Sequence, residues 1–105
     1  MRRIAAKVDA NQRPIIEALE AAGCSVTIIS QKGVPDLSVG RVDHGIPRTY
    51  WLEVKGEAGP QGGTSHRELT KAQRLWWSTW QGHARVVRTP QEALQAVGIA
   101  TGART

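Results

Sequence analysis

The sequence predicts an α/β fold in a single domain, with its elements in the order helix, three strands, helix, strand and helix. Three observations lead to this prediction. Short β-branched runs alternate with longer segments in which apolar residues recur at helical spacing. Each helical segment begins near a capping residue, and the first two end at a glycine. A turn-forming stretch at residues 43–47 joins two of the strands as a hairpin.

Size and cysteine content bound the class of protein. The 105 residues are enough for one domain with a modest core. No apolar run approaches the length of a membrane span, and the first residues lack the apolar stretch of a signal peptide. The only cysteine, Cys24, cannot form an internal disulfide, so we expect a protein of the reducing cytoplasm. Cys24 itself is predicted to be a small buried residue at the start of a strand.

The charge balance favours a polyanionic partner. The net charge is +5, and the sequence pI is about 10.2. A basic chain of this kind is typical of nucleic-acid-binding proteins, although charge by itself does not identify one.

The first helix is expected to begin near Asn11, because Pro14 is tolerated only in the first helical turn. Asp9 or Asn11 can cap this helix, and Gly23 ends it. Residues 1–8, before the helix, are predicted to be a flexible basic arm. The apolar face of the helix consists of Ile15, Ile16, Leu19 and Ala22.

Two strands and a hairpin follow the first helix. Residues 25–30 are β-branched and predict a short strand, and residues 31–33 turn the chain. Pro35 is expected at the first position of the second strand, where its missing N–H does least harm. After the turn at residues 43–47, the third strand is expected at residues 50–55. The apolar positions that continue the second strand are Leu37, Val39 and Val42.

A glycine-rich loop at residues 56–68 separates the third strand from the second helix. His66 within the loop is expected to be exposed to solvent. Thr70 can cap the second helix, which is predicted to run to about Gln81 and to end at Gly82.

The second helix carries most of the tryptophans. Trp76 and Trp80 belong to its apolar stripe and are expected in the core. Trp77 lies off the stripe, where it could cover a core edge, contact a second copy of the chain or stack on nucleic acid. The full stripe consists of Leu69, Ala72, Trp76 and Trp80, with Leu75 and Thr79 beside it.

The chain closes with a strand at residues 83–88 and a helix at residues 90–97. Thr89 is the expected cap of that helix, Pro90 suits its first position, and Glu92 is expected to complete a capping box. Residues 99–105 are predicted to be a loose tail.

Acidic and basic side chains meet at the second and third strands. Side chains alternate between the faces of a strand, so Glu53 and Lys55 share one face at roughly 7 Å from each other. If the two strands pair as a hairpin, Asp36 and Glu53 converge on one point. Two carboxylates suit Mg²⁺ or Mn²⁺, and a neighbouring lysine can hold a phosphate oxygen or an attacking water. This arrangement is typical of phosphodiester cleavage.

A structural interpretation of the same residues stays open. Asp36 could cap a turn, while Glu53 and Lys55 decorate an exposed face of the sheet. Two facing carboxylates repel each other, however, so a bound cation accounts for their convergence better.

These residues also carry a family resemblance. The pattern Pro35-Asp36…Glu53-Val54-Lys55 resembles the PD-(D/E)XK nucleases. The later Leu69-Thr70-Lys71-Ala72-Gln73, with the strand and helix after it, is similar to their VRR-NUC branch, especially its small stand-alone phage-type members. The resemblance covers residues 9–98. It implies one restriction-endonuclease-like domain with the order α-β-β-β-α-β-α around a mixed sheet.

The resemblance implies a metal-dependent DNA endonuclease that uses Mg²⁺ or Mn²⁺. It assigns catalysis to Asp36, Glu53 and Lys55, and it adds the carbonyl of Val54 to the two carboxylates as a metal ligand. A polar residue of the first helix is expected near the metal, and Gln73 of the second helix is expected to face the same site. The first-helix candidates are Gln12 and Glu17, with Asp9 as a third.

The substrate implied by the phage-type members is branched DNA such as a four-way junction, cut by a homodimer inside a phage-infected or bacterial cell. Two alternatives stay open: a catalytically weak nucleic-acid-binding subunit that keeps the nuclease fold, and a restriction or repair nuclease that works with another chain. The residues expected to contact phosphates are Lys32, Arg67, Lys71 and Arg74.

Overall fold

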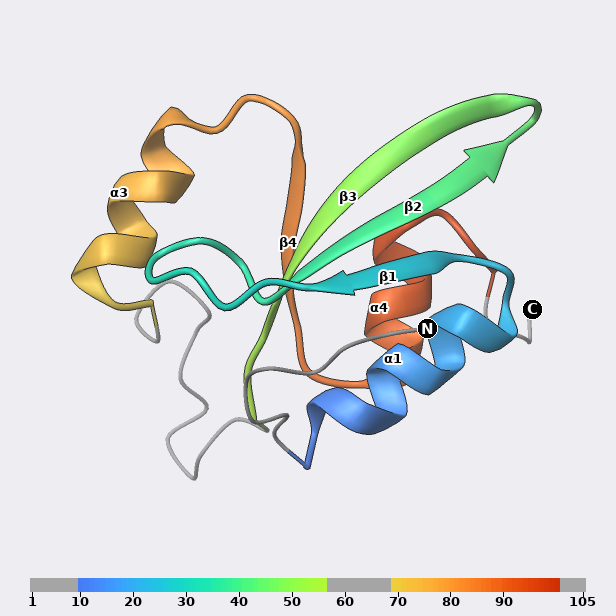
Figure 1. Cartoon of the computed structure of the whole chain (residues 1–105), viewed down its shortest axis with the longest axis horizontal. Coiled ribbons are helices and arrows are strands. Elements are labelled where there is room, and N and C mark those ends of the chain that lie inside the picture. Colours follow the sequence, from blue (N-terminus) through green and yellow to red (C-terminus); the bar gives the residue numbers. More distant parts are fainter. Residues whose placement is uncertain (1–9, 57–68, 101–105) are drawn as a thin grey trace.

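The computed structural model of the chain describes residues 10–56 and 69–100, which form a four-stranded sheet and three helices (Figure 1). The α/β class is confirmed, and the described elements follow one another as helix, three strands, helix, strand and helix. Several predictions lie outside the described residues: the arm at residues 1–8, Asp9, most of the glycine-rich loop with His66 and Arg67, and the tail beyond residue 100.

The sheet is mixed, as predicted. Its strands lie in the order β1-β2-β3-β4. Strand β2 is antiparallel to both β1 and β3, while β4 is parallel to β3. The strand bounds are Ser25–Ile28 for β1, Leu37–Asp43 for β2, Ile46–Val54 for β3 and His83–Val87 for β4.

A tight hairpin fixes the register between the two central strands. His44 and Gly45 both have positive φ, 53° and 80°, which is the geometry of a two-residue type I′ turn. The predicted hairpin is therefore confirmed, but its ladder is longer than expected, because β3 already begins at Ile46. The register places Leu37 opposite Leu52.

The core lies on one face of the sheet, beneath helices α1 (Gln12–Ala21) and α4 (Pro90–Ala96), which also pack against each other (Figure 1). Cys24 is buried just before β1, as predicted. No helix in the described part of the chain is long and apolar enough to cross a membrane. The residues that form the centre of the core are Ile15, Leu19, Leu37, Val39, Leu52, Val87, Ala93 and Val97.

The helix ends confirm some capping predictions and correct others. Gly23 ends α1 with φ +95°, and the next N–H, from Cys24, donates to the carbonyl of Leu19 at 3.0 Å in a Schellman arrangement. Asn11 directly precedes α1, but the prediction that its side chain caps the helix is wrong. Its backbone is already helical, and its side chain makes no capping hydrogen bond.

The last helix is capped in part as predicted. Thr89 Oγ1 accepts a hydrogen bond from the N–H of Glu92 at 3.1 Å. Glu92 Oε1 accepts from the N–H of Arg88 at 2.7 Å rather than from that of Thr89, so the predicted reciprocal bond is wrong. The tail is also shorter than predicted, because Ile99 packs against the core and its N–H donates to the Leu94 carbonyl at 2.9 Å.

Helix α3 (Lys71–Thr79) stands on the other face of the sheet, and none of its residues is buried (Figure 1). The prediction that Trp76 and Trp80 belong to the core is therefore wrong. The two indoles stack at 5.0 Å between ring centroids, and each contacts Trp51 of β3 at 5.9 and 5.7 Å. Because α1 and α4 already fill the core face, the apolar stripe of α3 packs on the opposite face. Trp77 contacts Trp76 edge-on at 5.8 Å.

The β1–β2 connection approaches α3 closely at Gly33. Gly33 has φ +84°, and a Cβ placed there would lie 3.1 Å from the Cβ of Ala72 and 3.2 Å from its carbonyl oxygen. Any side chain at this position must therefore move either the connection or the helix.

We expect Gly33→Ala to lower the free energy of unfolding by more than Gly45→Ala. Both substitutions put alanine at a positive φ, at a cost of about 1–2 kcal/mol, but Gly45 has nothing within 4 Å of the added Cβ. Gly33→Ala should cost about 1–3 kcal/mol more through overpacking. Urea denaturation followed by tryptophan fluorescence measures both. Equal losses for the two variants would show that the Gly33–Ala72 contact does not position α3.

Candidate metal centre

Two carboxylates meet at one end of the central strand pair. Asp36 directly precedes β2, and Glu53 is the residue after Leu52, the partner of Leu37. Since Leu37 and Leu52 point into the core, strand alternation places Asp36 and Glu53 on the face that carries α3. Asp36 Oδ2 also accepts a hydrogen bond from the Val54 N–H at 2.8 Å, which ties the aspartate to β3.

Glu53 is almost fully buried, with 2% of its surface exposed. Burial, with the nearby charge of Asp36 as a second cause, raises the pKa of Glu53 to about 7, although Lys55 opposes the shift. Its Oε1 is buried and accepts no hydrogen bond in the described structure, while a hydrogen bond between the Glu53 and Asp36 side chains, which a protonated Glu53 can make, is a further cause of the raised pKa. The interpretation in which Glu53 decorates an exposed sheet face is therefore wrong.

Lys55 and Gln73 both act on the other oxygen of Glu53. Lys55 Nζ lies 3.4 Å from Glu53 Oε2, and Gln73 Nε2 donates to the same oxygen at 2.8 Å. Gln73 Oε1 in turn accepts from Lys55 Nζ at 3.3 Å. Gln73, which was expected to face the site, therefore lies in it and is hydrogen-bonded to both Glu53 and Lys55.

A capping box holds Gln73 in place. The Gln73 N–H donates to Thr70 Oγ1 at 3.2 Å, while Gln73 Oε1 accepts from the Thr70 N–H at 2.9 Å. Thr70 was predicted as a cap, but its reciprocal partner Gln73 was not. The signal was present, because Thr-x-x-Gln is the spacing of a capping box.

The carboxylate pair fits a hard divalent cation. Mg²⁺ is commonly held by one or two carboxylates, with water and substrate phosphates as its remaining ligands. The unpartnered Oε1 of Glu53 beside Asp36 is an open acceptor of this kind. Within residues 10–56 and 69–100, no group of three or more His, Cys, Asp or Glu side chains gathers as a ligand set. The role of the Val54 carbonyl stays a prediction, since the contact seen here uses the Val54 N–H.

The first-helix candidates differ in burial. Gln12 lies in the first turn of α1 with 7% of its surface exposed, and its Oε1 is buried without a partner among the described residues. Glu17 is exposed. The approach of either side chain to a metal stays a prediction.

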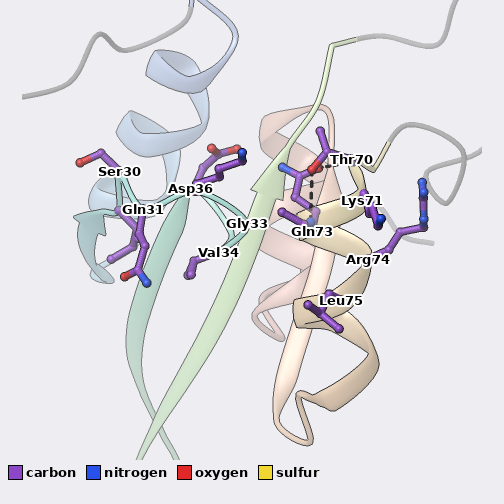
Figure 2. A pocket seen from close by; sticks show the side chains of 13 residues that line it. Ser30, Gln31, Gly33, Val34, Asp36, Thr70, Lys71, Gln73, Arg74 and Leu75 are labelled. Atoms are coloured by element: carbon purple, nitrogen blue, oxygen red, sulfur yellow. Dashed lines mark hydrogen bonds between the residues drawn. The ribbon is translucent and has the colours of Figure 1, made fainter.

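A cleft of about 1230 Å³ opens between residues 29–36 and the first half of α3 (Figure 2). Asp36 and Gln73 are among its lining residues, which connects it to the carboxylate pair. Three of the four residues expected to contact phosphates also line it, namely Lys32, Lys71 and Arg74, while Arg67 lies outside the described residues.

Comparison of the chain with known protein families, curated proteins and solved structures found no match. The likeness to PD-(D/E)XK nucleases therefore rests on the sequence pattern alone, and the geometry around Glu53 has to support a function by its own chemistry.

The raised pKa of Glu53 predicts how stability depends on pH without metal. Between its ordinary value of 4.5 and about 7, the folded chain holds a proton that the unfolded chain releases. This contribution is complete below about pH 4.5 and is lost as the pH rises through 7. In EDTA, the free energy of unfolding should fall over this range by on the order of 3 kcal/mol more for the wild type than for Glu53→Gln.

Urea denaturation at a series of pH values measures this difference. Adding Mg²⁺ above pH 7 should restore stability to the wild type more than to Glu53→Gln, because a cation binds the ionised carboxylate pair best. Parallel pH profiles for the two proteins in EDTA would show that Glu53 titrates normally.

Proposed function

We propose that this chain is a metal-dependent endonuclease that hydrolyses phosphodiester bonds in DNA. The observation that carries the proposal is the buried Glu53 beside Asp36, with one unpartnered carboxylate oxygen and with Lys55 Nζ 3.4 Å from the other. Buried side-chain oxygens are usually hydrogen-bonded, so an oxygen that accepts no hydrogen bond beside a second carboxylate is the kind of acceptor that a bound cation would complete.

Each residue has a definite part in hydrolysis. Asp36 and Glu53 would hold Mg²⁺ or Mn²⁺, which when bound neutralises charge on the phosphate and on the leaving oxygen. Lys55 is an ammonium, with three donors and no acceptor, so it orients the attacking water or a phosphate oxygen and does not remove a proton. Gln73 holds both side chains in position, because its amide donates to Glu53 Oε2 and accepts from Lys55 Nζ.

The choice of DNA as substrate rests on the net charge of +5 and on the resemblance to small phage-type VRR-NUC proteins. The same resemblance favours branched DNA such as a four-way junction. Paired cuts across a junction need two active sites, so a homodimer is the simplest functional unit. A cytoplasmic location, inside a bacterial or phage-infected cell, belongs to the same proposal.

A nucleic-acid-binding subunit without catalysis is the second candidate. In this structure the charge of Lys55 is engaged by Glu53 and Gln73, and the cationic residues around the cleft would serve binding equally well. Variants that separate cleavage from binding distinguish the two functions.

Glu53→Gln, Asp36→Asn and Lys55→Ala should each reduce Mn²⁺-dependent cleavage of a four-way junction by a factor of at least about 100. This is the loss expected when one preorganised charge-stabilising group is removed. Binding of the same junction in Ca²⁺ should persist, and the two acid-to-amide changes should tighten it, because they lessen repulsion of phosphate.

Glu20→Gln is the matched control, since Glu20 is an exposed acid on α1. It should cleave like the wild type, and circular dichroism should show that all four variants are folded. Equal cleavage by Glu53→Gln and the wild type would remove the nuclease and leave the binding subunit.

Phosphate contacts at the cleft should appear as salt dependence. Lys32→Ala and Lys71→Ala should each lower the slope of log affinity against log salt concentration for DNA by about 0.7–0.9, the values for one lost phosphate contact with a single strand and with a duplex. Arg13→Ala, on the exposed side of α1, is the control and should leave the slope unchanged. Gel shifts at several salt concentrations provide the slopes, and a salt-insensitive complex would point to a protein partner instead.

A further inference from the structure

We propose that the cleft between residues 29–36 and helix α3 binds a single DNA strand whose bases are unpaired. The inference rests on the proposed function and deepens it, because it states the form in which DNA reaches the carboxylate pair. It comes from the lining of the cleft and from which flank of α3 faces it.

The contact between Gly33 and Ala72 shows which flank of α3 faces the cleft. Successive helical residues are about 100° apart, so Lys71 and Leu75 lie beside Ala72 on the side that faces residues 29–36. Arg74 also lines the cleft, but it lies about 200° from Ala72 around the helix, so it contributes at the cleft's edge. Its Nη1 donates to the Leu69 carbonyl at 2.7 Å, and Figure 2 shows its side chain extending away from Gln31 and Val34.

Both walls of the cleft combine apolar surface with positive charge. Ile29 and Val34 face it from the β1–β2 connection, and Leu75 lines it from α3. Leu75 is 69% exposed, so its side chain leaves apolar surface open to water beside the cleft. Lys32 stands on one wall and Lys71 on the other, and neither forms an ion pair with an acid among the described residues.

This combination suits an unpaired strand better than a duplex. A duplex stacks its base faces inside and presents phosphates and groove edges, so an apolar wall gains little from it. An unpaired strand presents base faces that contact apolar side chains, together with phosphates that pair with lysines. The volume of about 1230 Å³ also exceeds the roughly 300–1,000 Å³ of a typical small-molecule site.

The cleft leads to the reactive groups. Asp36 lines it from one wall and Gln73 from the other, and Gln73 Nε2 donates a hydrogen bond to Glu53 Oε2. A strand that lies along the cleft therefore carries its phosphates past the carboxylate pair. This path places a phosphodiester at the site without a duplex having to enter.

The test compares binding of a fluorescein-labelled thymidine strand of about 12 nucleotides with binding of a duplex of the same length, in Ca²⁺. Leu75→Ala should weaken binding of the single strand by about 5-fold, because it removes an apolar surface that contacts a base face. Duplex binding should be unchanged. Val42→Ala is the matched control, because Val42 is 67% exposed and lies at the end of β2, and it should change neither affinity.

Leu75→Lys separates apolar contact from charge. It should weaken binding of the single strand while strengthening binding of the duplex, since it removes an apolar surface and adds a cation. Tighter binding of both DNAs by Leu75→Lys, or no effect of Leu75→Ala on the single strand, would overturn the proposal, as would a wild type that binds only duplex.

Cleavage assays keep this inference distinct from the nuclease proposal. Mn²⁺-dependent cleavage by the wild type, with Leu75→Ala binding the single strand as the wild type does, would remove the strand site and leave the nuclease. Loss of single-strand binding in Leu75→Ala, with no cleavage by the wild type of any substrate, would keep the strand site and remove the nuclease.

Discussion

The burial of Glu53 beside Asp36 is the constraint on which the rest of the site depends. Removing an ionised carboxylate from water costs several kcal/mol, and a second carboxylate nearby adds repulsion. Gln73 and Lys55 offset this cost, but both act on Oε2, while Oε1 keeps no partner in the described structure. In an ion pair with a structural role alone, an unpartnered Oε1 would only lower stability. The unpartnered oxygen therefore favours a site that a bound cation completes.

Helix α3 owes its position to side chains rather than to the core. None of its residues is buried, and it meets the rest of the fold through Gln73, through the indoles of Trp76 and Trp80 on Trp51, and through Ala72 at Gly33. Glu53 lies on β3 and Asp36 directly precedes β2, and both strands pack on the core. Gln73, in contrast, lies on a helix that has no buried residue. Elements with few buried contacts open at low free energy, so the environment of Glu53 can respond to whatever contacts α3.

Local rules predicted much of this architecture and failed where long-range packing decides. Strand alternation placed Glu53 and Lys55 on one face of the third strand, and Gly23 and the residue 43–47 turn were identified from backbone preferences alone. The apolar stripe of α3 showed which side of the helix meets the protein. It did not show that α1 and α4 fill the core face, so Trp76 and Trp80 were assigned wrongly. The burial of Glu53 was hidden for the same reason, because α3 supplies part of its cover.

Lys55 shows how the same contacts can serve two states of the site. Without a cation, its ammonium is the group that opposes the rise in the pKa of Glu53. Neutralisation of the carboxylate pair removes the charge that holds Lys55 at Glu53 Oε2, while Gln73 still donates to that oxygen and still accepts from Lys55. In the proposed nuclease, Lys55 would then keep its place through Gln73 and would have donors free for a phosphate oxygen. The Thr70 capping box is what holds Gln73 itself in position.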